Sequence, residues 1–149
     1  MNPFLLKPDE RLESWKSIRN ALKDLDESEA LQLVAEYWAQ APMLKMAYDP
    51  ALPDEWPSPW EMVSDGDWCP YSVATGMEFT LRLAGWAPER MQILHIRDYD
   101  ISDERCVLKI DESVFLNYNE GFVVDIPTTR YDVLGTVQSN GKRYFLATK

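Results

Sequence analysis

Apolar residues recur at helical spacing in two stretches near the start of the chain. In residues 9–25 they fall three or four positions apart, and Pro8 precedes them as a helix-start signal. Asp26 and Glu29 are spaced as the N-cap and N3 residues of a capping box, so a second helix is expected after them. Because each stripe is one-sided, the pattern predicts a helical hairpin over residues 1–46 that packs on something larger. The apolar positions are Leu12, Trp15, Ile18, Leu22 and Leu25 in the first helix, and Ala30, Leu31, Val34, Ala35 and Trp38 in the second.

A proline-rich connector is predicted over residues 47–60. Four prolines make it extended and stiff rather than flexible. Trp56 and Trp60 lie in this connector, and either they pin it to the core or they form an aromatic anchor for a partner. Pinning is favoured because tryptophan is highly buried on average. The prolines are Pro50, Pro53, Pro57 and Pro59.

Two more helices are expected after the connector. Ser58 and Glu61 match the N-cap and N3 positions of a short helix that stops at Gly66. The spacing of Val73, Met77, Leu81 and Ala84 then predicts a central helix over residues 71–84 with one apolar face. Gly76 inside this helix costs up to about 1 kcal/mol, which indicates close backbone packing at that position.

After Gly85 the pattern changes from helix to strand. Short apolar runs predict strands over residues 91–97, 106–110, 114–118 and 122–126, and Asn140-Gly141 is a two-residue hairpin signal. Helices followed by an antiparallel meander indicate an α+β fold. Residues 61–149 are expected to hold the central helix and the sheet, and residues 1–149 to form a single domain.

Charge excludes several classes of partner. The 149 residues carry 25 acidic and 15 basic side chains, a net charge of −10. A nucleic-acid binder needs a basic face, and an anionic membrane surface attracts basic segments, so neither nucleic acid nor membrane is expected as a partner. The first residues lack the basic and long apolar regions of a secretory signal, which favours a cytoplasmic location.

The inventory of reactive residues is small. The chain has two cysteines, Cys69 and Cys106, and one histidine, His95. Their number and spacing match no zinc site, and two cysteines in a cytoplasmic-looking chain are expected to be free thiols. The acidic loop at residues 97–104 lacks the turn glycine of a calcium loop and is interpreted as solvated. No metal and no cofactor are expected.

Cys69 and Pro70 precede the central helix, where the unpaired N–H groups of a helix start lower the pKa of a thiol. The expected order of a central helix, a strand and then a hairpin resembles that of the transglutaminase-like, papain-related superfamily. The bacterial cysteine proteinases of this superfamily carry Gly-Asp-Cys-x-Asp-Tyr-Ala at the start of the corresponding helix. Gly66-Asp67-Trp68 and Tyr71-Ser72 resemble that motif. The region of this chain that resembles the family is roughly 60 residues long. The resemblance implies a transglutaminase-like fold with a cysteine, a histidine and an acid at its site.

The three catalytic positions of that family are altered in this register. Trp68 stands at the nucleophile position, Arg105 at the base position and Asn117 at the position of the orienting acid. An arginine cannot act as a general base because it stays protonated. If the chain is active, its groups would be Cys69, His95 and Asn117. Strand alternation, with Leu94 and Ile96 toward the core, predicts that His95 points away from Cys69.

Three functions follow as hypotheses. The first is a non-catalytic transglutaminase-like domain that contacts other protein subunits. The segments WPSPWE and GMEFTLRLAGW loosely resemble small proteins of tailed bacteriophages, which implies a structural or assembly protein that is found in the host cytoplasm and then in the virion. The second is a cysteine hydrolase or acyltransferase that uses Cys69 and His95. The third is an acidic inhibitor that blocks a basic groove of a host protein.

Overall fold

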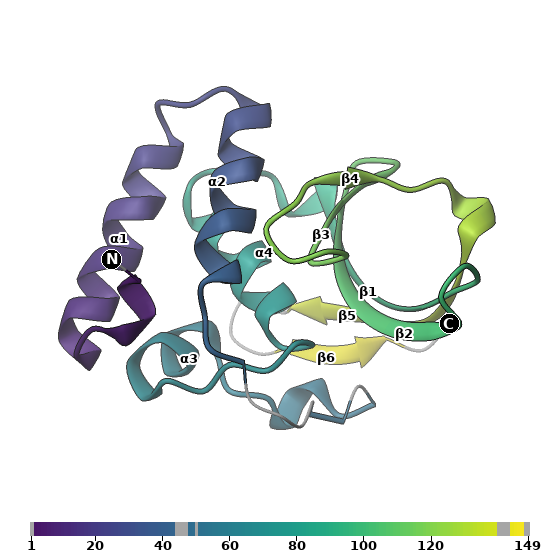
Figure 1. The fold of residues 1–149 in the computed structure, drawn as a ribbon, viewed down its shortest axis with the longest axis horizontal. Helices are drawn as coiled ribbons and strands as arrows, with labels where there is room; N and C mark the ends of the chain where they lie inside the picture. The colour runs from purple at the N-terminus through teal and green to yellow at the C-terminus, as the bar shows by residue number, and fades with distance from the viewer. Residues whose placement is uncertain (1, 44–47, 50, 140–143, 148–149) are drawn as a thin grey trace.

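The structure is a computed structural model that describes residues 2–43, 48–49, 51–139 and 144–147. Within these residues, four helices lie on one side of a six-stranded antiparallel sheet (Figure 1). The helices are α1 (Pro8–Leu22), α2 (Glu27–Ala39), α3 (Pro59–Asp65) and α4 (Val73–Leu83). The strands are β1 (Met91–Asp98), β2 (Asp103–Ile110), β3 (Val114–Leu116), β4 (Val124–Asp125), β5 (Tyr131–Ser139) and β6 (Tyr144–Ala147). Short 3-10 turns are η1 (Pro3–Leu5), η2 (Pro53–Glu55), η3 (Pro88–Arg90) and η4 (Thr128–Arg130).

The N-terminal helices begin where their local signals place them. The Asp26 side chain caps α2 by accepting a hydrogen bond from the Glu29 N–H, as predicted. The first helix is shorter than predicted, because α1 ends at Leu22 and residues 23–25 form a turn. Trp15 from α1 and Trp38 from α2 are both completely buried. The hairpin therefore packs its apolar stripes inward, as their one-sided spacing predicts.

The short helix α3 confirms its predicted boundaries. Ser58 accepts from the Glu61 N–H, and the Glu61 carboxylate accepts from the Ser58 N–H, which completes a capping box. Gly66 ends the helix in the left-handed region, with φ of 74°.

The central helix α4 runs at the interface between the other helices and the sheet. It begins at Val73 rather than at residue 71, because residues 70–72 form a turn that leads into it. Val73, Met77 and Leu81 are buried in the same cluster as Ile93 and Leu108 of the sheet, which confirms the predicted apolar face. At Gly76 the Trp38 ring approaches so closely that a Cβ would lie 2.6 Å from its nearest carbon.

The sheet has the strand order β4-β3-β2-β1-β5-β6, so β1 is central. Pairing along β1 and β2 is continuous from Met91 opposite Ile110 to Asp98 opposite Asp103. The predicted strand positions are confirmed, although β2 begins earlier than predicted and β3 and β4 are shorter. The strands β5 and β6 pair antiparallel, and the predicted Asn140-Gly141 turn between them lies outside the described residues.

The sheet has apolar cores on both of its faces. One core lies between the sheet and the helices and includes Ile93 and Leu108. The other lies on the opposite face, where Leu94, Ile96 and Phe115 pack together. Figure 1 shows the backbone of β1 and β2 curving, with β4 and the connection to β5 closing a ring. Strand β1 therefore carries buried side chains on both of its faces, while Gln92 and Arg97 are exposed.

Within the described residues, no helix has the length and apolar composition needed to span a membrane.

Candidate functional site

The two thiols and the histidine meet at the N-terminal end of α4. Cys69 lies just before the turn into this helix, while His95 and Cys106 face each other across β1 and β2. The Tyr71 ring, two residues after Cys69, has its centroid 5.7 Å from that of His95. The chain thus brings together the groups that the sequence offers for cysteine chemistry.

The Cys69 sulfur is enclosed. Its residue is 0% exposed, and Sγ accepts hydrogen bonds from the backbone N–H groups of Tyr48, at 3.1 Å, and Tyr71, at 3.4 Å. The Tyr48 hydroxyl in turn bonds to the Asp67 carboxylate, and burial together with that carboxylate raises the pKa of Tyr48 to about 12. This arrangement holds the thiol in place among the described residues, and Cys69 is buried there.

His95 lies on the helix side of the sheet, which corrects the predicted orientation. It does project opposite to Leu94 and Ile96, but those two residues face the second core rather than the core under α4. Residues directly opposite in an antiparallel pair project to the same side, and the partner of His95 is Cys106, which belongs to the core shared with the helices. The prediction that His95 projects opposite to Leu94 and Ile96 was right, but the prediction that this side of the sheet faces away from the helices was wrong.

The imidazole bonds to a carboxylate rather than to a thiol. His95 Nε2 donates to Glu104 Oε1 at 2.7 Å, and Arg97 donates to the other oxygen of Glu104. These bonds, first that of Arg97 and then that of His95, lower the pKa of Glu104. Across the part of the chain that the structure describes, no hydrogen bond joins His95 to Cys69.

Cys106 is equally enclosed. It is 2% exposed, and burial raises the pKa of its thiol above the ordinary value. A buried thiol with a raised pKa stays protonated at neutral pH and is a poor nucleophile. Both cysteines are free thiols, as predicted.

Asn117 fixes the edge of the site. Its side-chain amide nitrogen donates to the Pro70 and Cys106 carbonyls, each at 2.8 Å, and so links the turn before α4 to β2. The residue has φ of 64°, a left-handed conformation that asparagine tolerates better than most residues. The amide thus holds backbone groups, and no hydrogen bond of the described residues joins it to His95.

Trp68, at the family's nucleophile position in the predicted register, is packed into the core. It is 4% exposed, with its ring edge-on to Phe4 at 5.0 Å and the Arg11 guanidinium 5.8 Å from its centroid. Arg11 also donates to the carbonyls of Val63 and Ser64 near the end of α3. The indole therefore ties the N-terminal segment to α3 rather than facing a substrate.

Arg105, at the predicted base position, lies on the Tyr118 ring, with 5.4 Å between the guanidinium carbon and the ring centroid. Its strand partner is Ile96, whose side chain enters the second core, so Arg105 projects to the side opposite His95 and Cys106. Its Nε is buried and has no hydrogen-bond partner among the described residues.

The two connector tryptophans differ in exposure. Trp56 is 8% exposed, and its indole N–H donates to the Asp49 carbonyl, so it pins the connector. Trp60 is 45% exposed, yet its ring is fixed against Trp15, with 4.8 Å between centroids, and near Arg19. Of these two partner-binding candidates, only Trp60 offers a surface.

Residues 99–103 of the acidic loop are exposed, as predicted, and the exception is Asp98 at its start. Asp98 is 0% exposed and accepts hydrogen bonds from the Asp100 N–H and the Tyr118 hydroxyl, with Arg130 at 3.6 Å. Its carboxylate thus holds the loop and the second core together. No group of three or more His, Cys, Asp or Glu side chains in the described ranges is arranged to hold a metal ion.

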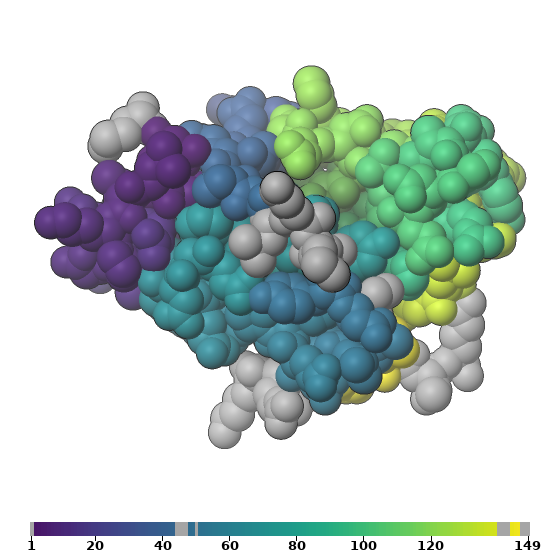
Figure 2. Space-filling model, turned by 60° about the horizontal axis from the view of Figure 1, so that its bottom comes forward, coloured from purple at the N-terminus to yellow at the C-terminus, as the bar shows by residue number. Residues whose placement is uncertain are grey.

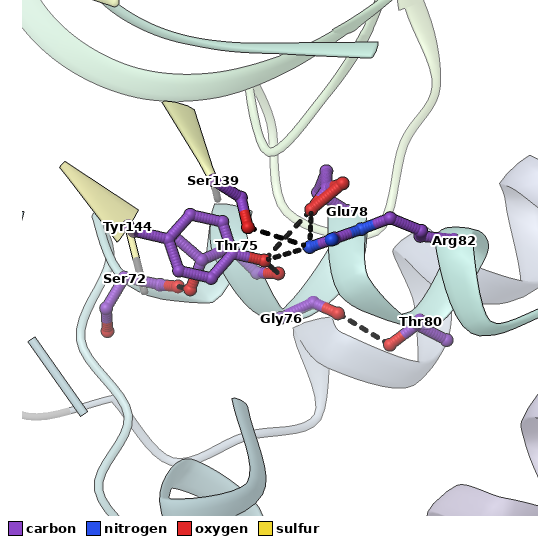
Figure 3. Close-up of polar contacts among 8 residues, drawn as sticks. All are labelled: Ser72, Thr75, Gly76, Glu78, Thr80, Arg82, Ser139 and Tyr144. Carbon is purple, nitrogen blue, oxygen red and sulfur yellow. Dashed lines mark hydrogen bonds and ion pairs between the residues drawn. The ribbon is translucent and has the colours of Figure 1, made fainter. Parts of the chain in front are cut away.

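A buried polar cluster at the other end of α4 was not predicted (Figure 3). Glu78, which is 6% exposed, accepts hydrogen bonds from Arg82 at 2.8 Å and from the Tyr144 hydroxyl at 2.9 Å. Arg82 also donates to the Ser139 hydroxyl. The i, i+4 spacing of Glu78 and Arg82 was the available signal, but such pairs usually lie on exposed helix faces. The cluster fastens α4 to β5 and β6.

A cleft of about 390 Å³ opens at the edge of the site. Pro70 and Tyr71 line one side of it, and two further walls come from residues 103–106 of β2 and residues 117–120 after β3. In Figure 2 the surface is hollowed between the segment near residue 120 and the β1–β2 turn. Tyr71 and Glu104 contact His95 here, whereas in the sequence they stood only in the resembled motif and in the acidic loop, because their contact with His95 depends on the fold.

Comparison with known proteins shows the fold. No family model matches the chain, and no curated protein matches it in sequence. Among solved structures, calcium-bound LapG of Legionella pneumophila superposes with a TM-score of 0.76 at 18% identity, over 97% of this chain and 82% of that one. EGTA-treated LapG gives 0.73 at 20% identity, over 95% and 78%. A third LapG structure gives 0.72 at 21%, over 94% and 80%. The chain has the transglutaminase-like α+β fold predicted from its sequence.

Proposed function

We propose that this protein is a non-catalytic transglutaminase-like domain that works through contacts with other protein subunits. The observation that carries the proposal is the enclosure of Cys69, which is 0% exposed. A working nucleophile needs a base within hydrogen-bond reach and room for a substrate. Here the base candidate, His95, is bonded to Glu104 instead.

The setting that we propose is a bacteriophage particle. The support is the loose resemblance of two sequence segments to small phage proteins, together with a fixed, half-exposed aromatic surface at Trp60 that suits contact with a partner. The protein would then be made in the host cytoplasm and incorporated into the virion as a structural or assembly component. Mass spectrometry of purified particles should detect it in stoichiometric amounts, and its absence from them would contradict this role.

The test of the non-catalytic role is the alkylation rate of Cys69. A Cys106→Ala variant leaves Cys69 as the single thiol. We expect slow reaction with iodoacetamide between pH 5 and pH 8, at the same rate in a Cys106→Ala/His95→Ala variant, because the thiol is enclosed and not paired with the imidazole. Urea-unfolded protein, as the control, should react fast. Rapid native alkylation below neutral pH that disappears with His95→Ala would refute the proposal.

One observation favours a second candidate, a cysteine hydrolase or acyltransferase. Cys69, His95 and Asn117, the three groups that such an enzyme would use, lie at the same end of α4, joined through Tyr71 and Pro70. A rearrangement that freed Sγ from the Tyr48 N–H would be required before they could act together. The same alkylation assay separates the two functions, since only the enzyme needs a thiolate whose reactivity depends on His95.

A further inference from the structure

Arg19 of α1 is held against two indole rings. Its guanidinium carbon lies 4.5 Å from the ring centroid of Trp15 and 5.1 Å from that of Trp60. The two rings are fixed, because they pack edge to face with 4.8 Å between centroids and the Trp15 N–H donates to the Thr80 hydroxyl at 2.9 Å. A guanidinium is attracted to the faces of aromatic rings and stacks on them. The Arg19 side chain is therefore already positioned before a partner arrives.

The charge of Arg19 is not compensated inside the protein. No salt bridge joins its guanidinium to a carboxylate of the described residues. Its Nε is buried and has no hydrogen-bond partner among the same residues. Burial also lowers the pKa of Arg19 from its ordinary value, because the charged form loses water. Since a partly desolvated charge is costly unless it is paired, this position favours the approach of an anion.

Arg19 is the middle member of a basic row on an acidic protein. Lys16, Arg19 and Lys23 are three and four residues apart, so they project from one side of α1 and its C-terminal cap. In the part of the chain that the structure describes, none of the three forms a salt bridge. The whole chain carries a net charge of −10, so this basic row is a local exception. Charge complementarity therefore selects an acidic partner.

An apolar surface lies beside the basic row. Trp60 is 45% exposed and Leu83 is 39% exposed, and the Phe79 ring lies between α3 and α4 with its centroid 6.1 Å from that of Trp60. We call Trp60, Phe79 and Leu83 the Trp60 surface. Phe79 and Leu83 belong to the C-terminal half of α4, whereas the cleft opens at the N-terminal end of this helix. Aromatic and arginine side chains are the residue types most enriched at protein interfaces.

We propose that the basic row and the Trp60 surface together bind an acidic segment of a partner protein, with one carboxylate of that segment paired to Arg19. This inference rests on the proposed protein-binding function and names the chemistry of the partner. The planar guanidinium offers N–H groups in a geometry that matches a carboxylate, and the two lysines add charges on flexible stems. Apolar side chains of the same segment cover the Trp60 surface and exclude water from the ion pair.

The test is titration of the protein with a fluorescein-labelled octapeptide of alternating Leu and Glu, followed by fluorescence anisotropy. The net charge of −10 repels this peptide from the molecule as a whole, so saturable binding requires a local site. We expect Arg19→Gln to weaken binding about tenfold, because it removes hydrogen bonds between charged groups. The matched control is Arg97→Gln, the same change of charge at an exposed side chain of β1, which should leave the affinity unchanged. Equal weakening by both variants, or no binding of the peptide, would overturn the proposal.

Two further variants test the part played by the rings, with circular dichroism to show that each variant is folded. Arg19→Lys keeps the charge but loses the planar group, so it should weaken binding nearly as much as Arg19→Gln. Trp60→Leu keeps every charge but removes one of the rings that position Arg19, and it should also weaken binding. Full affinity in both variants would show attraction to positive charge alone and would overturn the proposal.

A second kind of anion tests the class of partner. An oligothymidylate with the same number of negative charges should bind more weakly than the peptide, and tighter binding would assign the basic row to nucleic acid and overturn the proposal. Alkylation of Cys69 and mass spectrometry of purified particles test the proposed function separately. Loss of peptide binding with slow alkylation and a virion location would therefore contradict this inference alone.

Discussion

The close contact between Gly76 and Trp38 predicts an unusual response to a small substitution. Glycine inside a helix costs up to about 1 kcal/mol relative to alanine, so Gly76→Ala would stabilise α4 if nothing lay beside it. A Cβ at this position would instead lie 2.6, 2.8 and 3.0 Å from three carbons of the Trp38 six-membered ring. The ring is completely buried, contacts Phe4 and Trp15, and donates through its N–H to the Thr80 hydroxyl, so it has no room to move.

Overpacking of this kind costs typically about 1–3 kcal/mol, and contact with a rigid ring places it near the upper end. After the gain in helix propensity is subtracted, Gly76→Ala should lower the free energy of unfolding by about 2 kcal/mol. The assay is urea unfolding followed by circular dichroism. In a Trp38→Phe background, where the clashing carbons are absent, the same substitution should be neutral or stabilising, which corresponds to a coupling energy of about 2–3 kcal/mol. Stabilisation by Gly76→Ala in the unaltered protein would refute the close approach.

Two other predictions concern stability. Leu81→Ala should destabilise by about 2–5 kcal/mol because its side chain is completely buried under the sheet, whereas Leu83→Ala, with 39% exposure on the same helix, should cost well under that in the same urea assay; equal costs would contradict the predicted apolar face. Burial raises the pKa of Tyr37 to about 12, so the folded state favours the neutral phenol. The contribution of the neutral Tyr37 phenol to the free energy of unfolding is fully present below the ordinary pKa of about 10. It is lost as the pH rises toward 12, by up to roughly 3 kcal/mol. Unfolding measured from pH 8 to 12 should therefore show a shallower alkaline decline in Tyr37→Phe, and an unchanged decline would count against this assignment.

Features set by neighbouring residues could be predicted from the sequence. The Ser58–Glu61 capping box and the Asp26 cap depend on groups three residues apart, and they were predicted at the correct positions. Gly76 signalled close packing because glycine in a helix interior is unfavourable unless something approaches the backbone. The partner, Trp38, could not be identified, since it lies on another helix.

Features set by distant contacts could not be predicted in the same way. Strand alternation assigns His95 to the side opposite Leu94 and Ile96, but it does not say which side faces α4. Because β1 is apolar in both directions, the usual assumption that the apolar side faces the helices failed. Asp98 gives a second case: within its loop it looks solvated, and only the fold brings Arg130 and Tyr118 to its carboxylate.

The burial of β1 on both faces separates two halves of the molecule that can diverge independently. Ile93 contacts the helical side, whereas Leu94 and Ile96 contact the ring closed by β4 and the connection to β5. Substitutions at alternating positions of one strand are thus constrained by different neighbours. The loops around the ring, which border the cleft, can be rebuilt through successive changes at Leu94, Ile96 and Phe115 while the packing of α4 on the sheet is kept. A new binding surface could therefore arise on one side of β1 while the packing of the helices on the other side stays the same.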